Sequence, residues 1–159
     1  MDTYINKPTP AFIAASWVAL LAGAAAYIVG LFNAHMMLNE KGYYLILILY
    51  GLFSAVSLQK VVRDKLEGTH VTPIYFGLCW ASVVICLVLL ALGLWNANLA
   101  LSEKGFYIMA FLLSLFGAVA VQKNIRDIEY LRTHSSPIIP MKSLDNETIQ
   151  IENNEENKF

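Results

Sequence analysis

Charged residues are scarce in this sequence. Asp, Glu, Lys and Arg make up 14% of its 159 residues and hydrophobic residues make up 57%, whereas about 25% of the residues of an ordinary soluble domain are charged. The formal net charge is −1, so the chain has no excess of positive charge with which to bind a nucleic acid. This composition excludes an ordinary soluble domain and indicates a membrane protein.

Cysteine is nearly absent as well. The two cysteines, Cys79 and Cys86, lie inside one apolar run, which excludes a disulfide framework. They are seven residues apart and therefore share a helix face. We interpret them as packing residues, because a buried free cysteine behaves mainly as a small hydrophobe. A metal site is the alternative, but the same run contains no His, Asp or Glu, so we predict no metal and no cofactor.

Asp, Glu, Lys, Arg and His are missing altogether from four segments. Two of them have 22 residues, enough at ~1.5 Å per residue to cross a ~30 Å hydrocarbon core. The other two have 16 residues and can cross only if their polar ends reach the interfaces or the bilayer thins. Backbone in lipid must satisfy its own hydrogen bonds, so all four are expected to be helices. The segments are Ala11–Phe32, Tyr43–Leu58, Ile74–Trp95 and Phe106–Val121.

The sequence repeats itself at an offset of 63 residues. Residues 30–64 and 93–127 share 18 identities in 35 positions, without a gap. Each unit contains two crossings, an even number, so both units enter the membrane from the same side and are parallel. Because the first crossing recurs as an internal crossing of the second unit, we expect it to be a retained helix rather than a cleaved signal peptide.

The predicted fold is an all-α membrane protein with four transmembrane helices, arranged as two parallel tandem helical hairpins. We divide the chain into a cytoplasmic N-terminus (1–9), a first two-helix membrane repeat (10–68), a second repeat (73–130) and a disordered acidic cytoplasmic tail (131–159). Small residues at helical spacing on each apolar segment, such as Ser16, Gly23 and Gly30 on the first, predict the faces on which the helices pack.

Lysine and arginine predict the orientation. Seven of them flank one side of the membrane and two flank the other, and the richer side is normally cytoplasmic. Both termini and the central loop are therefore expected in the cytoplasm. The seven are Lys7, Lys60, Arg63, Lys65, Lys123, Arg126 and Arg132, and the two are Lys41 and Lys104.

The motif Gln-Lys-x-x-Arg-Asp follows both shorter segments. Basic side chains at a helix end interact with its dipole and extend to the headgroups, which is the simpler interpretation. The alternative is a contact site for anionic lipid or for a partner protein. The candidate residues are Lys60, Arg63, Asp64, Lys123, Arg126 and Asp127.

A second motif, Glu-Lys-Gly, marks both outer turns. Gly42 and Gly105 are expected to adopt positive φ just after a helix end, and the amides of Asn33 and Asn96 to bond across to a partner helix. A ligand site at these turns is the alternative interpretation, since loops often carry function. Its candidate residues are Asn33, Glu40, Lys41, Asn96, Glu103 and Lys104.

Both motifs, together with Gly-Leu-(Phe/Trp)-Asn-Ala, occur in order and twice. This pattern resembles the bacterial YiaA/YiaB family of inner-membrane proteins, whose unit is the YiaAB two-helix domain. The resemblance covers roughly residues 8–130 and is nearest to the members with two units. It implies a multi-pass protein of the bacterial inner membrane and supplies no reaction or catalytic residue.

The apolar segments contain no Asp, Glu, Lys, Arg or His, whereas proton- and ion-coupled carriers usually place such a residue there. No catalytic motif occurs either, so we predict that the chain is not an enzyme. The leading hypothesis is a non-enzymatic structural or accessory membrane component that contacts membrane lipids and a second copy or another membrane protein. The alternative is a small transporter or channel, with a pore formed between subunits or repeats.

Overall fold

The computed structural model describes residues 8–134, and four helices make up most of this part of the chain. All four are long and apolar enough to cross a membrane, which confirms the predicted all-α class. Residues 1–7 and 135–159, which include most of the predicted N-terminal segment and acidic tail, lie outside the described residues. The helices are α1 (Pro10–Asn33), α2 (Leu38–Leu66), α3 (Pro73–Asn96) and α4 (Leu101–His134).

Residues with particular backbone preferences mark where the helices begin and end. α1 and α3 each start at a proline, whose fixed φ and missing N–H suit the first turn of a helix. α2 ends at a Schellman motif: Gly68 has φ +78°, and the Thr69 and Gly68 N–H groups donate to the Asp64 and Lys65 carbonyls. α2 and α4 reach 29 and 34 residues because the polar segments around their apolar cores are helical too.

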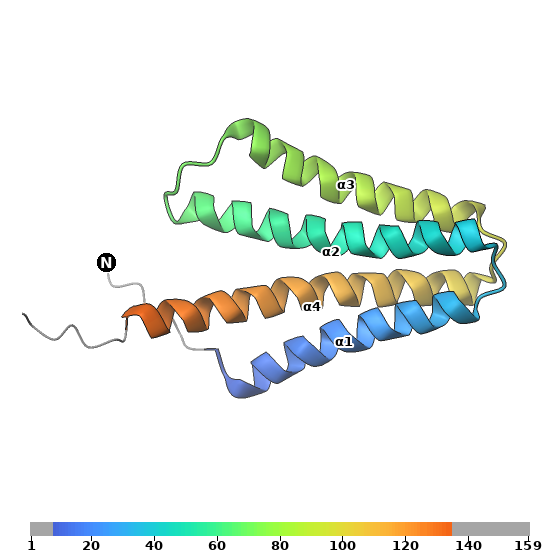
Figure 1. The fold of residues 1–159 in the computed structure, drawn as a ribbon, viewed down its shortest axis with the longest axis horizontal. Coiled ribbons are helices and arrows are strands. Elements are labelled where there is room, and N and C mark those ends of the chain that lie inside the picture. The colour runs from blue at the N-terminus through green and yellow to red at the C-terminus, as the bar shows by residue number, and fades with distance from the viewer. Residues whose placement is uncertain (1–7, 135–159) are drawn as a thin grey trace, which may run out of the picture.

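The helices alternate in direction along the bundle (Figure 1). The α1–α2 and α3–α4 connections lie at one end, which we call the turn end. The central loop, the start of α1 and the end of α4 lie at the opposite end, which we call the motif end because both Gln-Lys-x-x-Arg-Asp motifs are there.

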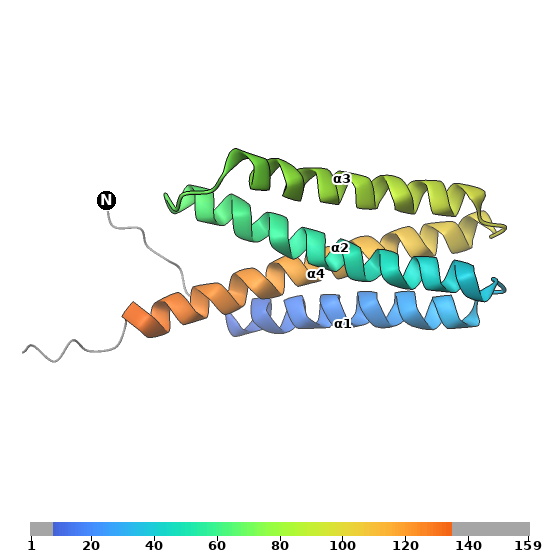
Figure 2. The same ribbon diagram turned by 45° about the horizontal axis from the view of Figure 1, so that its top comes forward.

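Packing joins helices of different repeats. α1 lies along α4 and α3 lies along α2 in both views (Figures 1 and 2), and α2 also contacts α4, whereas α1 and α2 touch little. The structure therefore does not confirm the two hairpins as packing units. Since the 63-residue offset converts α1 into α3 and α2 into α4, the α1–α4 and α3–α2 pairs are quasi-equivalent.

The core is filled with aromatic side chains in the half of the bundle nearer the turn end. Tyr27 and Phe111 are 0% exposed, and the Tyr27 ring meets that of Tyr107 edge to face at 5.5 Å between centroids. The Tyr27 hydroxyl donates to the Tyr44 carbonyl over 3.1 Å, so this polar group is satisfied inside the bundle.

Small residues bring the paired helices close together, as their spacing predicts. A Cβ atom added to Gly23 of α1 would lie 2.7 Å from the Ser114 backbone nitrogen of α4. One added to Gly117 of α4 would lie 2.4 Å from the Leu20 nitrogen of α1. On the other pair, Gly51 of α2 faces Cys86 of α3, at 3.2 Å from an added Cβ. The cysteines are buried, and the described residues contain no cluster of His, Cys, Asp or Glu that could hold a metal ion.

Candidate functional site

The two Gln-Lys-x-x-Arg-Asp motifs meet at the motif end through crossed ion pairs. Arg63 of α2 donates to Asp127 of α4 over 2.8 Å, and Arg126 of α4 donates to Asp64 of α2 over 3.2 Å. Each arginine therefore pairs with the aspartate of the other repeat. All four side chains are partly buried, between 12% and 27% exposed, and such pairs are stronger than those on an open surface. We call these four residues the ion-pair clamp.

Glu67 extends the clamp at the end of α2. Its carboxylate lies 2.6 Å from Arg63 and 3.7 Å from Arg126, so both guanidinium groups have two acidic neighbours. The lysines of the motifs remain outside this network: Lys60 and Lys123 are exposed, and neither forms an ion pair within residues 8–134. Of the six residues predicted at this end, four therefore bind one another and two stay available to lipid or to a partner.

Buried amide groups lie just inside the clamp. Asn124 is 2% exposed and donates to the Ser16 hydroxyl of α1 over 3.1 Å. The side-chain oxygens of Gln59, Gln122 and Asn124 are buried and accept no hydrogen bond within the described part of the chain. Unsatisfied buried acceptors are uncommon in folded proteins and call for an explanation, such as a bound water or ligand.

The turn end uses Glu-Lys-Gly to cap helices, and the expectation of positive φ at Gly42 and Gly105 is wrong. The turns lie earlier in the chain than predicted, at residues 34–37 and 97–100, so both glycines are helical. Gly68 is the positive-φ glycine of the described residues. Glu40 accepts from the Met37 N–H over 2.9 Å and Glu103 from the Ala100 N–H over 2.8 Å. Each carboxylate thus satisfies an otherwise unpaired donor at the start of its helix.

The lysines of the same motif cap the preceding helices. Lys41 donates to the Phe32 carbonyl over 2.9 Å, and Lys104 donates to the Trp95 carbonyl over 3.4 Å. Cations at a helix C-terminus are favourable there. The four charged candidates of the turn end therefore have a structural role in both repeats.

The asparagines of the turn end do not bond across helices as expected. Asn96 donates to the Leu92 carbonyl of its own helix over 3.0 Å, and within the described residues Asn33 shows no bond to another helix. The structure nevertheless brings these amides close to the opposite repeat. One hollow of about 330 Å³ is lined by Asn33 and Glu103, and another of about 230 Å³ by Asn96 and Glu40. They are quasi-equivalent under the 63-residue offset.

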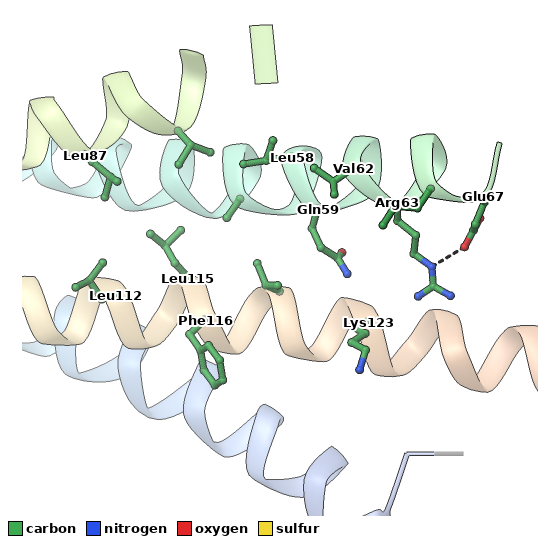
Figure 3. A pocket seen from close by; sticks show the side chains of 14 residues that line it. Leu58, Gln59, Val62, Arg63, Glu67, Leu87, Leu112, Leu115, Phe116 and Lys123 are labelled. Carbon is green, nitrogen blue, oxygen red and sulfur yellow. Dashed lines mark hydrogen bonds and ion pairs between the residues drawn. The ribbon is translucent and has the colours of Figure 1, made fainter. Parts of the chain in front are cut away.

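A groove lies between α2, α3 and α4, on the motif-end side of the aromatic core. Its volume is about 740 Å³. Leu87 of α3, Leu112 of α4 and Leu58 of α2 are among its apolar lining residues, and Gln59, Arg63, Glu67 and Lys123 lie toward its motif end (Figure 3). We call this the α2–α3–α4 groove.

The two repeats differ at a position that sets how closely the paired helices approach. Gly117 of α4 admits the Leu20 backbone of α1. At the equivalent positions of the other pair stand Ser54 of α2 and Val83 of α3. Close helix approach depends on the absence of a side chain, so α1 can lie tightly on α4 while α3 stays farther from α2. Val83 lines the open groove as a result.

The motifs predicted the polar positions of the site but not its cavity. Asn124 was missed because its counterpart in the first repeat is Val61, so the repeat did not single it out. The groove was missed because its lining residues are ordinary leucines, valines and a phenylalanine. The signal that could have found it is the Gly117–Ser54 difference at equivalent positions.

Comparison with known proteins supports the repeat. The family model of the yiaA/B two-helix domain matches residues 12–64 and again 75–127. The chain is 59% identical over 127 residues to "Inner membrane protein YiaA" of Escherichia coli K12, covering 80% of this chain and 88% of that protein. It is 35% identical over 72 residues to "Uncharacterized membrane protein YubF" of Bacillus subtilis 168, covering 45% and 83%. No solved structure matches the chain significantly.

Proposed function

The chain belongs to the family of the yiaA/B two-helix domain. We propose that it is a non-enzymatic accessory component of the bacterial inner membrane. In this proposal it acts through contacts of its lipid-facing helices with another membrane protein or a second copy. Both termini lie in the cytoplasm in this proposal.

The observation that carries the proposal is the closed aromatic core. Tyr27, Tyr107 and Phe111 pack ring against ring between all four helices, and they are 0–3% exposed. A transport path through a single copy would have to cross this core, which we call the aromatic plug. Conducting pores are instead filled with water and lined by polar groups. The groove and the turn-end hollows lie on opposite sides of the plug, which argues against a continuous path within one chain.

The outer faces of the helices offer the surface for a partner. Large hydrophobic side chains are exposed along α1, such as Val18 at 65%, Leu21 at 61% and Val29 at 58%. In a membrane these residues meet lipid tails or a neighbouring helix. Transmembrane helices associate through packing and polar contacts rather than through hydrophobic exclusion, so exposure alone does not distinguish the two environments.

Site-specific crosslinking in native membranes tests the proposal. A photoreactive amino acid at Leu21 or Val29 should capture a recurrent protein neighbour, while the same group at the buried Tyr27 should capture none. Mass spectrometry after mild solubilisation would identify the neighbour. If the outward-facing positions of all four helices yielded adducts to lipid alone, the accessory role would be wrong.

The alternative is a channel or transporter whose pore forms between copies, and the duplicated halves and the two turn-end hollows favour it. A homo-oligomer without another protein neighbour would direct attention to this alternative. Purified protein in proteoliposomes should then conduct ions or small metabolites faster than protein-free vesicles, and absence of such flux would argue against it.

A further inference from the structure

The α2–α3–α4 groove has the shape and chemistry of a lipid site. We propose that it binds one phospholipid, with an acyl chain between the helices and the phosphate group beside Lys123 at the motif end. A volume of about 740 Å³ lies within the range of ~300–1,000 Å³ typical of small-molecule sites. This inference goes beyond the accessory role and does not depend on it.

The inner wall of the groove is apolar and open to the bilayer. Leu87, Leu112 and Phe116 line it and are 40%, 45% and 63% exposed, so no protein side chain of the described residues covers them. Within the hydrocarbon region such a surface contacts acyl chains or the apolar side chains of a neighbouring helix. The groove therefore selects an apolar occupant over most of its length.

The depth of the groove matches one leaflet. Leu112 and Lys123 are eleven residues apart on α4, which corresponds to about 16 Å along the helix axis. This is about half of the ~30 Å hydrocarbon thickness of a bilayer. A phospholipid of the leaflet at the motif end would place its chain beside Leu112 and its headgroup beside Lys123.

Polar groups at the motif end suit a phospholipid headgroup. Arg63 and Glu67 neutralise one another there (Figure 3), which leaves the ammonium group of Lys123 as the unneutralised charge of the groove lining. A phosphate group would accept hydrogen bonds from this ammonium group. The buried oxygen of Gln59 has no donor within the described residues, and a headgroup hydroxyl or ammonium group would provide one.

The quasi-equivalent surface formed by α4, α1 and α2 is packed more closely. There Gly117 lets the backbone of α1 approach α4, whereas Val83 of α3 lines the open groove. The asymmetry predicts one bound phospholipid per chain rather than two, and it provides a matched control for every substitution.

Native mass spectrometry of the full chain, extracted with its surrounding lipid, tests the proposal. Wild-type protein should retain one phospholipid per chain. Val119→Phe, which fills the groove, should lower this occupancy about tenfold or more, and Lys123→Gln should lower it about fivefold. The equivalent changes Val56→Phe and Lys60→Gln should leave it unchanged. Occupancy that survives Val119→Phe, or that falls equally in both members of each pair, would overturn the proposal.

Photolabelling covers the case in which Val119→Phe does not fold. Wild-type protein is reconstituted with a phosphatidylglycerol that carries a photoreactive group in one acyl chain. Adducts should concentrate on Leu87, Leu112 and Phe116. Equal labelling of the equivalent Ala24, Leu49 and Phe53 would mean ordinary bilayer contact and would refute a specific site. Adducts from a photoreactive residue at position 87 to a protein helix would also refute it.

Discussion

At the scale of single residues, the contact between α1 and α4 depends on glycines that leave room for backbone. Gly117 is the tightest of these, since an added Cβ would meet the Leu20 backbone nitrogen at 2.4 Å. A backbone atom cannot move aside as the end of a flexible side chain can, so any larger residue must push the two helices apart.

We predict that Gly117→Ala lowers the free energy of unfolding by about 1–3 kcal/mol, the usual cost of overpacking. Unfolding of the protein in mixed micelles would measure it. Gly105→Ala is the control, because no atom lies within 4 Å of its added Cβ and alanine is the better helix former by up to about 1 kcal/mol. Equal effects of the two substitutions would contradict the close approach.

The aromatic plug gives a second residue-scale prediction. Phe111 is 0% exposed and Phe53, an outward-facing residue of α2, is 70% exposed. Phe111→Ala should destabilise the protein by about 3 kcal/mol or more, because it leaves a cavity between all four helices. Phe53→Ala should change stability by less than about 0.5 kcal/mol. The same micelle unfolding assay compares them, and a costly Phe53→Ala would indicate that this face is covered by a partner.

At the scale of the helices, the ion-pair clamp joins α2 to α4 and thereby joins the two repeats. Arg63 and Asp127 lie 2.8 Å apart and are 23% and 12% exposed. Removing one partner leaves a partly buried charge without its counter-ion, which costs more than the pair itself contributes.

We predict that Arg63→Asp lowers the free energy of unfolding by about 2–4 kcal/mol, since it places two carboxylates together. The double variant Arg63→Asp with Asp127→Arg should recover more than half of the loss. Lys60→Asp, one turn earlier on α2 and outside the clamp, is the control for charge reversal alone. If the double variant were no more stable than Arg63→Asp, the crossed pairing would be wrong.

The helices themselves follow from the sequence, whereas their pairing does not. Apolar length, the prolines that start α1 and α3 and the 63-residue repeat are local signals, so the crossings are predictable from them. Small residues occur on one face of every helix, and such faces are compatible with α1 on α2 or α1 on α4. Only the three-dimensional arrangement shows that Gly23 meets Ser114, 91 residues away in the chain.

In the candidate site too, the sequence predicts individual residues but not how they pair. Repetition of Arg63 and Asp64 as Arg126 and Asp127 marks these residues as significant, but sequence alone does not show that each arginine pairs with the aspartate of the other copy. Sequence alone predicts that Glu40 and Lys41 lie in a loop, because Gly42 resembles a helix terminator. The carboxylate of Glu40, three residues after Met37, is the signal that correctly starts the helix there.

At the scale of the whole molecule, the two ends of the bundle differ in charge. Of the seven lysines and arginines that the sequence assigns to one side, six lie at the motif end and Lys7 precedes the described residues, whereas two lysines lie at the turn end. Short loops rich in such residues are retained in the cytoplasm during insertion. Four of the seven belong to the two Gln-Lys-x-x-Arg-Asp motifs, so the repeat doubles the bias instead of cancelling it, as an inverted repeat would.

We therefore predict that the turn end faces the periplasm in a Gram-negative cell. Cysteine is introduced at the exposed positions His35 and Asn98, which are equivalent in the two turns, and at Thr69 in the central loop, with Cys79 and Cys86 replaced by alanine. A membrane-impermeant maleimide applied to spheroplasts should label positions 35 and 98, and should label position 69 only after the membrane is opened.

Labelling at 69 alone would show the reverse orientation. Labelling at both ends would show a mixed population, in which the charge difference is too small to orient the chain. Agreement between positions 35 and 98 also tests the duplication, because two parallel repeats must place both turns on the same side of the membrane.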